Sequence, residues 1–221
     1  MKVIIGLPAY NEERAIAGVV LQAKEYADKV IVVNDGSVDK TSKIAKLAGA
    51  DVIEHGVNKG YGAAIKTILE EVGRCNTDIL VIIDSDGQHD PNEIPLLVNA
   101  IMSGSDIVIG SRKSCKAAIP VYRRLGQLIL TKFTNIVSHQ NLSDTESGFR
   151  AYSRKAITEL ELTQKGMAIS AEIIWVASRK GLKITEVPIS VSYNNVRSSQ
   201  NPILHGLGNL SQILILILKH N

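Results

Sequence analysis

Two continuous apolar runs, each followed at once by acidic residues, constrain the fold of this chain more than any other feature. Residues 30–33 (VIVV) lead into 34–37 (NDGS), and residues 79–83 (ILVII) lead into 84–90 (DSDGQHD). Apolar runs of this length are typical of strands that are buried on both faces of a parallel sheet. Because ligands of such sheets bind beyond the carboxyl ends of the strands, the acidic residues predict a site for a cation, a ribose or both.

The chain as far as residue 110 alternates strand patterns with helix patterns. The expected strands are 2–7, 30–33, 51–54, 79–83 and 106–110. The expected helices are 39–47, 62–72, one capped by Asn11 with Glu12 and Glu13 in its first turn, and one that begins at Asp90-Pro91. Later residues predict helices 120–138 and 168–179 and strands 148–152 and 183–193. This alternation predicts an α/β fold with a mostly parallel central sheet flanked by helices.

Size and composition limit the classes of protein to consider. The 221 residues, 45% of them hydrophobic, can form one full core, which we place in a domain over residues 1–200. The apolar run 213–218 is too short to span a membrane, so residues 201–221 predict an amphipathic or docking helix. A net charge of +3 and only 4% aromatic residues argue against nucleic-acid binding. Two cysteines are too few for a disulfide framework, which favours the cytoplasm.

The acids that follow residues 79–83 are close enough in sequence to share one ligand. If the backbone stays extended, Asp84 and Asp86 project from the same face. A hard divalent cation prefers oxygen ligands, which Asp86 and the amide oxygen of Gln88 offer. The alternative is that these acids only cap a turn, although Asp90 already supplies the cap of the next helix. His89 either reaches a phosphate from this segment or lies in a surface loop.

Asp35 ends the neighbouring strand, and basic residues gather later in the chain. A carboxylate at the position of Asp35 can accept hydrogen bonds from a base or a ribose, and its alternative role is a turn with Gly36. The basic residues of the segment 112–132 are Arg112, Lys113, Lys116, Arg123, Arg124 and Lys132. Arginine binds phosphate through paired hydrogen bonds, so this cluster suits a phosphate ligand. The alternatives for these residues are solvated surface charges or contacts with anionic lipid.

Four motifs occur in order along the chain: residues 7–13 (LPAYNEE), 34–37 (NDGS), 84–89 (DSDGQH) and 147–150 (SGFR). Together they resemble glycosyltransferase family 2, and most closely its polyprenyl-phosphate sugar synthase branch, which includes dolichyl-phosphate mannose synthase. The resemblance runs from Met1 to about Tyr193. It implies a GT-A type nucleotide-diphospho-sugar transferase fold, a nucleotide-sugar donor and a Mg²⁺ or Mn²⁺ ion.

By position, the resemblance implies roles for individual residues. Those implied for the pocket of the donor nucleotide are Pro8, Tyr10, Glu12, Asp35 and Asp84, the last of them beside the ribose. Those implied for the metal are Asp86 and Gln88. Those implied for the acceptor phosphate are Arg112 and Arg123 or Arg124. Asp86 and Arg112 are the residues expected to act in catalysis, and Asp144 either lines the acceptor side or caps a turn.

One departure from the family pattern concerns the acceptor. Many members that glycosylate sugar hydroxyls carry a late Glu-Asp pair whose Asp is the base, whereas this chain has residues 170–172 (SAE). That leaves Glu172 without an assigned role. A sugar hydroxyl needs a base to become a nucleophile, but a phosphomonoester, with a second pKa near ~6, is already an anion at neutral pH. The sequence therefore favours a phosphate as the acceptor.

The resemblance, together with these observations, implies a metal-dependent, inverting glycosyltransferase. It would move a sugar from GDP-mannose or a UDP-sugar to a polyprenyl (dolichyl) phosphate, as a peripheral protein at the cytosolic face of a membrane. One alternative keeps the nucleotide-sugar site but takes a saccharide or protein-linked glycan as acceptor, with Glu172 as base. The other is a nucleotide-sugar-binding module without turnover.

Overall fold

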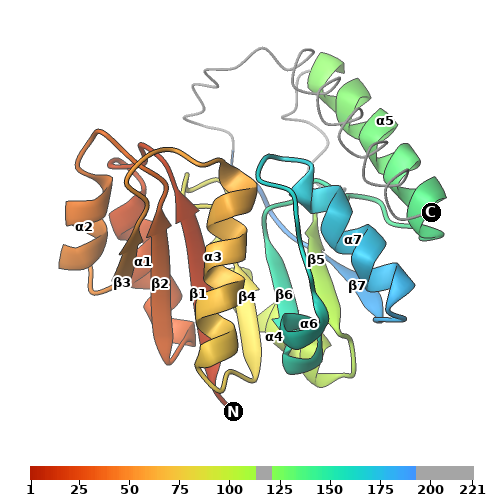
Figure 1. Ribbon diagram of the computed structural model, residues 1–221, viewed down its shortest axis with the longest axis horizontal. Coiled ribbons are helices and arrows are strands. Elements are labelled where there is room, and N and C mark those ends of the chain that lie inside the picture. Colours follow the sequence, from red (N-terminus) through yellow and green to blue (C-terminus); the bar gives the residue numbers. More distant parts are fainter. Residues whose placement is uncertain (113–120, 193–221) are drawn as a thin grey trace.

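A mostly parallel sheet forms the centre of the protein (Figure 1). The computed structural model describes residues 1–112 and 121–192, and in them seven strands lie in the order β3-β2-β1-β4-β6-β5-β7. The strands are β1 Val3–Ala9, β2 Lys29–Asn34, β3 Asp51–Glu54, β4 Ile79–Ile82, β5 Ile107–Ser111, β6 Arg150–Ser153 and β7 Ile184–Pro188. Among them β6 alone is antiparallel to its neighbours, β4 and β5. The predicted α/β fold with a mostly parallel central sheet is confirmed.

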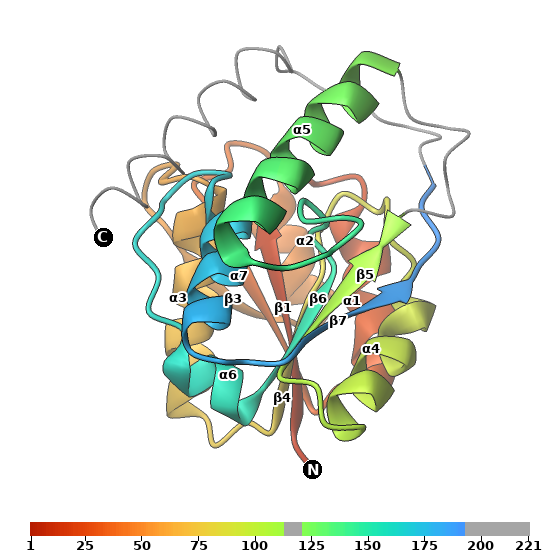
Figure 2. The same cartoon turned by 90° about the vertical axis from the view of Figure 1, so that its right-hand side faces the viewer.

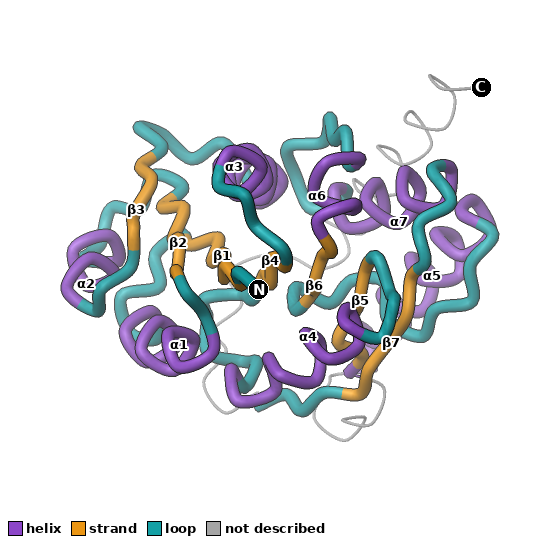
Figure 3. Tube along the Cα trace, turned by 90° about the horizontal axis from the view of Figure 1, so that it is seen from below, coloured by secondary structure: helices purple, strands orange, loops and turns teal. Residues whose placement is uncertain are grey.

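Helices cover both faces of the sheet, as Figure 3 shows from below. One face carries α1 Ile16–Ala23, α2 Thr41–Leu47 and α4 Ile94–Met102, and the 3₁₀ turns Lys24–Tyr26 and Pro91–Glu93 adjoin α1 and α4. The other face carries α3 Tyr61–Arg74, α6 Arg154–Glu159 and α7 Ile169–Arg179. The long helix α5, Val121–Ser138, packs against α7 outside these layers (Figure 2).

The strands are apolar along their whole length because both of their faces are buried. Ile4 and Ile5 are both fully buried, but on opposite faces of the sheet. Ile5 belongs to the core on one face, and Ile4 belongs to the core on the other. Burying an aliphatic side chain of this size contributes about 1.5–3 kcal/mol. Packing on both faces therefore fixes the positions of the parallel strands, and of their ends, relative to one another.

Several expected boundaries differ from the observed ones. The helix expected to start at Asn11 begins at Ile16, and Asn11 instead adopts a positive φ of 57°. Its backbone N–H donates to the Ser37 hydroxyl and its side-chain oxygen accepts from the Val38 N–H, so it joins two loops. The strand expected over 183–193 is shorter, and α6 was not expected at all. The helix expected over 201–221 lies outside the described residues.

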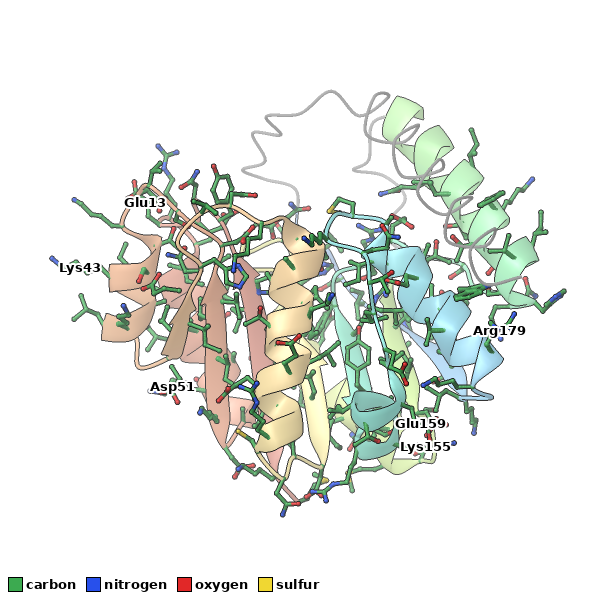
Figure 4. All side chains as sticks on the ribbon, in the orientation of Figure 1. Glu13, Lys43, Asp51, Lys155, Glu159 and Arg179 are labelled. Atoms are coloured by element: carbon green, nitrogen blue, oxygen red, sulfur yellow. The ribbon has the colours of Figure 1, made fainter. Side chains whose placement is uncertain are left out.

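Charged side chains project from the outside of the fold. Figure 4 shows Lys43 and Asp51 at one side of the molecule and Lys155 and Glu159 at the other, all pointing outward. In residues 1–112 and 121–192, no helix combines the length and the apolar character that crossing a membrane requires.

Candidate active site

The acidic residues expected to form a site do meet at one edge of the sheet. The parallel strands β1, β2 and β4 end there, and so does β5, which leads into Arg112. Because β6 is antiparallel, its first residues lie at this edge, together with the preceding Gly148. Ser85 donates a hydrogen bond to the carbonyl of Pro8 (2.7 Å), which fixes the loop after β4 to the end of β1. Tyr10, directly after β1, is 47% exposed at the same edge.

Asp84 is held between α3 and the start of β6. The Tyr61 hydroxyl donates to Oδ1 of Asp84 (3.0 Å). Gly148 lies so close to the carboxylate that a Cβ added at this glycine would overlap it. Burial raises the pKa of Asp84, and the Tyr61 hydrogen bond and the positive charges of Arg112 and Arg150 partly oppose the rise. The carboxylate thus has one fixed orientation.

Asp86 lies in the turn after β4, not in a continued strand. The chain leaves the extended conformation after Ile82, and Gly87 has a φ of 74°. The backbone N–H of Gln88 donates to Oδ1 of Asp86 (2.9 Å), and its side-chain amide donates to Oδ2. Burial raises the pKa of Asp86, and the charge of Asp84 raises it further.

Glu12 completes an acidic cluster, which we define as Glu12, Asp84 and Asp86. Burial raises the pKa of Glu12 to about 7, and the negative charges of Asp86, Asp39 and Asp84 add to the effect. Carboxylates that raise one another's pKa in this way are typical of a site that a cation neutralises. The cluster accordingly fits the oxygen preference of Mg²⁺ or Mn²⁺.

The arrangement of these residues is not a preformed metal shell. Over residues 1–112 and 121–192, no three histidine, cysteine or acidic side chains are positioned to hold one ion. The Gln88 amide nitrogen, rather than its oxygen, faces Asp86. Asp86 and Gln88 therefore remain a prediction as metal ligands, and a divalent ion would have to draw Gln88 away from that hydrogen bond.

Glu12 gives the stability of the protein a defined pH dependence. Its pKa is near 4.5 when unfolded and about 7 in the fold, so the folded state binds the extra proton between these values. Stability from this group is complete below pH 4.5 and is lost as the pH rises through 7. We expect Glu12→Gln to be more stable than the wild type by about 1–2 kcal/mol at pH 8, a value reduced for partial exposure, and nearly equal at pH 4.5.

Urea unfolding at the two pH values, without divalent ions, measures this difference. The exposed residue Glu25 provides the matched control, because Glu25→Gln should change stability little at either pH. A Glu12→Gln protein that is less stable than the wild type at pH 8 would contradict the expected sign.

Asp35 is buried, with 3% of its surface exposed. Its carboxylate accepts hydrogen bonds from the backbone N–H groups of Lys59 (3.0 Å) and Gly60 (2.8 Å), and it lies 2.7 Å from Nδ1 of His55. It therefore fixes the loop before α3. The Gly36 turn that follows needs its glycine, because φ is 73° and a Cβ would overlap the backbone of Val57 and Asn58. A contact of Asp35 with a nucleotide stays a prediction.

Arg112 and Asp144 form a bidentate ion pair. Nε and Nη2 of Arg112 donate to the two carboxylate oxygens over 2.6 and 2.8 Å, and the backbone N–H of Arg112 adds a third bond. Burial favours a higher pKa for Asp144, but the hydrogen bonds and charge of Arg112 hold that pKa below its ordinary value. Asp144 thus orients Arg112. Arg123 and Arg124 lie in the first turn of α5, and their side chains are outside the described part of the structure.

His89 is not a surface-loop residue. It is 5% exposed, it packs on Phe149 with ring centroids 5.6 Å apart, and its Nε2 lies 3.9 Å from Asp84. Burial lowers its pKa to about 4, so the ring is neutral at pH 7. Within the described residues its Nδ1 has no hydrogen-bond partner. The ring therefore contacts Phe149 and lies near Asp84 of the acidic cluster.

Arg150 of the SGFR motif is a buried residue that holds the loop beside Asp84 in place. It is 3% exposed, and its guanidinium donates to the carbonyls of Ser147 (2.8 Å), Thr145 (2.6 Å) and Ser170 (3.2 Å). These bonds fix the loop that ends at Gly148. From the sequence, Arg150 belongs to a motif without an assigned role, and a contact of Tyr61 with Asp84 is not expected. The only signal for Tyr61 was its place in a glycine-rich loop before a helix.

Glu146 is a second acid that sequence analysis left without a role. It lies between Asp144 and the SGFR motif. Burial raises its pKa, and the positive charges of Arg150 and Arg112 partly oppose the rise. The residue therefore adds an acid to the side of the site that holds the Arg112–Asp144 pair.

Glu172 lies in the first turn of α7, and its carboxylate is bound to a loop. It is 2% exposed and accepts hydrogen bonds from the backbone and hydroxyl of Thr163 (2.8 and 2.6 Å) and from the backbone of Gln164 (2.9 Å). The next residue, Lys165, accepts through its carbonyl from the N–H of Ala63 at the start of α3 (3.1 Å). Glu172 therefore holds a loop against α3, which argues against a role as base.

Comparisons with known proteins agree with this geometry. The sequence profile described as Glycosyl transferase family 2 matches residues 4–161. A similar protein is the UDP-N-acetylglucosamine–dolichyl-phosphate N-acetylglucosaminyltransferase of Methanococcus voltae, 35% identical over 212 residues, which cover 85% of this chain and 84% of that protein. Another is the polyprenol monophosphomannose synthase of Mycolicibacterium smegmatis, 31% identical over 206 residues, which cover 86% and 77%.

A solved structure is similar over nearly the whole chain. It is glucosyl-3-phosphoglycerate synthase from Mycobacterium tuberculosis in complex with Mn²⁺, UDP-glucose and phosphoglyceric acid. The TM-score is 0.75 at 26% sequence identity, and the match covers 98% of this chain and 78% of the other. That protein thus combines this fold with a divalent ion, a nucleotide-sugar and a phosphorylated acid.

Proposed function

The chain belongs to glycosyltransferase family 2 and is a glycosyltransferase, and from this premise we propose that it transfers one sugar from a nucleotide-diphosphate donor to a polyprenyl phosphate. One observation carries the proposal: the acidic cluster and Arg112 lie at the same sheet edge, close enough for the Arg112 charge to affect the pKa of Asp84. This arrangement supports a metal-bound diphosphate and a second phosphate binding next to each other.

The donor side of the site uses the acidic cluster. Asp86 and Gln88 would hold Mg²⁺ or Mn²⁺, with Asp84 beside the ribose, and the ion would offset the charge that develops on the leaving diphosphate. Tyr10, Pro8 and Asp35 border the same edge at the ends of β1 and β2 and are proposed to contact the nucleotide. Tyr61 keeps Asp84 in a single orientation, so the cluster is organised before the donor binds.

The acceptor side uses the cationic groups. A phosphate oxygen of the acceptor attacks the anomeric carbon, the bond from that carbon to the diphosphate oxygen breaks, and the configuration inverts. The acceptor is already an anion at neutral pH, so no base needs to remove a proton. Arg112, oriented by Asp144, is proposed to bind this phosphate, together with Arg123 or Arg124. The binding of Glu172 to its loop agrees with a reaction that needs no base.

The relatives support the choice of acceptor. The two described above are named for dolichyl phosphate and for polyprenol monophosphomannose, and both match this chain over most of its length. A lipid acceptor implies action at a membrane surface, and we propose the cytosolic face. On α5, Leu128, Ile129 and Ile136 are exposed hydrophobic residues near Lys132, a composition that suits contact with a lipid surface.

Arg112→Lys tests the acceptor side. Lysine keeps the charge but cannot make the paired hydrogen bonds to Asp144, so its position is no longer fixed. We expect kcat/KM for the polyprenyl phosphate to fall about 10- to 100-fold, while the affinity for the nucleotide changes little. Steady-state kinetics with the acceptor varied, and calorimetry with the nucleoside diphosphate, separate the two effects. An unchanged acceptor KM and kcat would place the phosphate elsewhere.

The function itself is tested by the release of nucleoside diphosphate. A panel of GDP- and UDP-sugars is incubated with Mg²⁺ or Mn²⁺, with and without a short polyprenyl phosphate. Release that requires the lipid phosphate supports the proposal and identifies the sugar. Release that does not depend on the lipid would indicate a saccharide or protein-linked glycan as the acceptor. Binding of the nucleotide-sugar without release would indicate a binding module without turnover.

A further inference from the structure

A buried histidine connects the end of β2 to α3 next to the proposed nucleotide site. His55 directly follows β3, and its backbone N–H donates to the carbonyl of Asn34 (2.9 Å). The residue is 7% exposed. Its Nδ1 lies 2.7 Å from Oδ1 of Asp35, and its Nε2 lies 3.0 Å from the hydroxyl of Thr67 on α3. The imidazole is thus held at both nitrogens.

One tautomer satisfies both of these contacts. With the proton on Nδ1, the ring donates to Asp35, and Nε2 accepts from the Thr67 hydroxyl. A ring in this tautomer leaves neither nitrogen without a hydrogen-bond partner, which matters because an unpaired buried polar atom destabilises the folded state. Thr67 therefore sets the orientation of the ring, and the ring sets the orientation of Asp35.

Within residues 1–112 and 121–192, three hydrogen-bond contacts are made to the carboxylate of Asp35. A carboxylate offers about four acceptor positions, two on each oxygen. Oδ1 is used by His55 and the Lys59 N–H, and Oδ2 by the Gly60 N–H. Among the described residues, the remaining acceptor position is on Oδ2. Any ligand that presents an N–H to Asp35 would have to approach this oxygen.

We propose that His55 is a positioning residue for the donor nucleotide, acting through Asp35. The inference rests on the proposed function, since it requires a nucleotide at this edge of the sheet. By occupying Oδ1, His55 stops the carboxylate from rotating and directs Oδ2 toward a ring N–H of the base. Uracil and guanine each carry such an N–H, whereas the ring nitrogen of cytosine at the equivalent position is an acceptor. The arrangement selects bases by the presence of that proton.

The test compares binding of nucleotides with and without the ring proton. The probes are UDP and GDP, their analogues methylated at uracil N3 and guanine N1, and CDP, measured by calorimetry with Mg²⁺. The variants are His55→Phe, which keeps a planar ring without nitrogens, and His55→Asn, whose amide can donate from nearly the position of Nδ1. Thr67→Val removes only the hydroxyl that contacts Nε2 of His55. Circular dichroism tests whether each variant is folded.

We expect the wild type to bind UDP or GDP about tenfold more tightly than its methylated analogue. His55→Phe should lose most of that preference and raise the donor KM about tenfold, with kcat changed less than about twofold. His55→Asn should restore much of the preference, and Thr67→Val should weaken it. If His55→Phe is not folded, the inference is still tested by comparing His55→Asn with Thr67→Val, because both are expected to keep part of the preference for the ring proton.

Two outcomes would overturn the inference, and they differ from each other. A folded His55→Phe protein that keeps the wild-type preference for the ring proton shows that His55 only stabilises the fold, and the proposed function then stands. A wild type that binds none of the nucleoside diphosphates contradicts the proposed function, and the role of His55 is lost with it. A lower melting temperature with unchanged nucleotide affinity belongs to the first outcome.

Discussion

Asp86→Asn is expected to lower turnover about 10²- to 10³-fold while the protein stays folded. Asparagine has the same shape as aspartate, and its side-chain oxygen can still accept from the Gln88 N–H, which lies 2.9 Å from Oδ1. The substitution removes a negative charge from the acidic cluster, where a divalent ion would otherwise bind. The loss should therefore appear in catalysis and in metal affinity, and not in the fold.

Release of nucleoside diphosphate at saturating donor, measured over a range of Mn²⁺ concentrations, gives the size of the effect. Asp90→Asn is the matched control, because Asp90 is an exposed acid of the same segment that caps the Pro91–Glu93 turn, and asparagine caps equally well. Asp90→Asn should keep wild-type turnover. Full activity in Asp86→Asn at low Mn²⁺ would refute the assignment of Asp86 to the metal.

Gly148→Ala is expected to have the second-largest effect. The added methyl group would occupy the space of the Asp84 carboxylate, so either Asp84 or the loop before β6 must move. Arg150 fixes that loop through two of its carbonyl groups and ties it to α7 through the carbonyl of Ser170, which makes Asp84 the group that yields. Displacing a group of the site by about 1 Å can cost on the order of 100-fold in rate, and overpacking costs about 1–3 kcal/mol in stability.

A second glycine provides a control for the general effect of replacing glycine by alanine. Gly73 lies in α3, and within the described part of the structure a Cβ there would meet nothing within 4 Å. Gly73→Ala should stabilise the protein by up to about 1 kcal/mol, because alanine favours a helix over glycine, and it should leave kcat/KM unchanged. Equal activities of Gly148→Ala and Gly73→Ala would show that the contact with Asp84 is unimportant.

The N-terminal part of the sheet, through β4, could be predicted from sequence because its signals are local. The runs 30–33 and 79–83 are apolar along their whole length, which is typical of strands that are buried on both faces. Since both strands are parallel, the acids that follow them had to meet at one edge, and Asp35 and Asp84 do lie there. The family prediction is confirmed by the profile over residues 4–161.

The remaining contacts could not be predicted because they join distant segments. Tyr61 reaches Asp84 only after α3 packs on the sheet, and the pairing of Arg112 with Asp144 depends on the order of β5 and β6. The sequence also suggests Asn11 as a helix cap by composition alone, whereas the two loop contacts that decide its conformation come from residues beyond β2. Side-chain partners of this kind follow from tertiary packing, which short motifs do not encode.

The antiparallel strand β6 makes the two halves of the chain depend on each other during synthesis. Ile82 at the end of β4 pairs with Arg150, and β5 is joined to β4 only through β6. A nascent chain that stops before residue 150 therefore exposes the apolar edge of β4 and has no partner for β5 on that side. Unpaired edges of this kind favour aggregation. A ribosome that pauses before residue 150 has been added would hold the N-terminal strands in an aggregation-prone state, even though the motifs of residues 7–13, 34–37 and 84–89 are already complete.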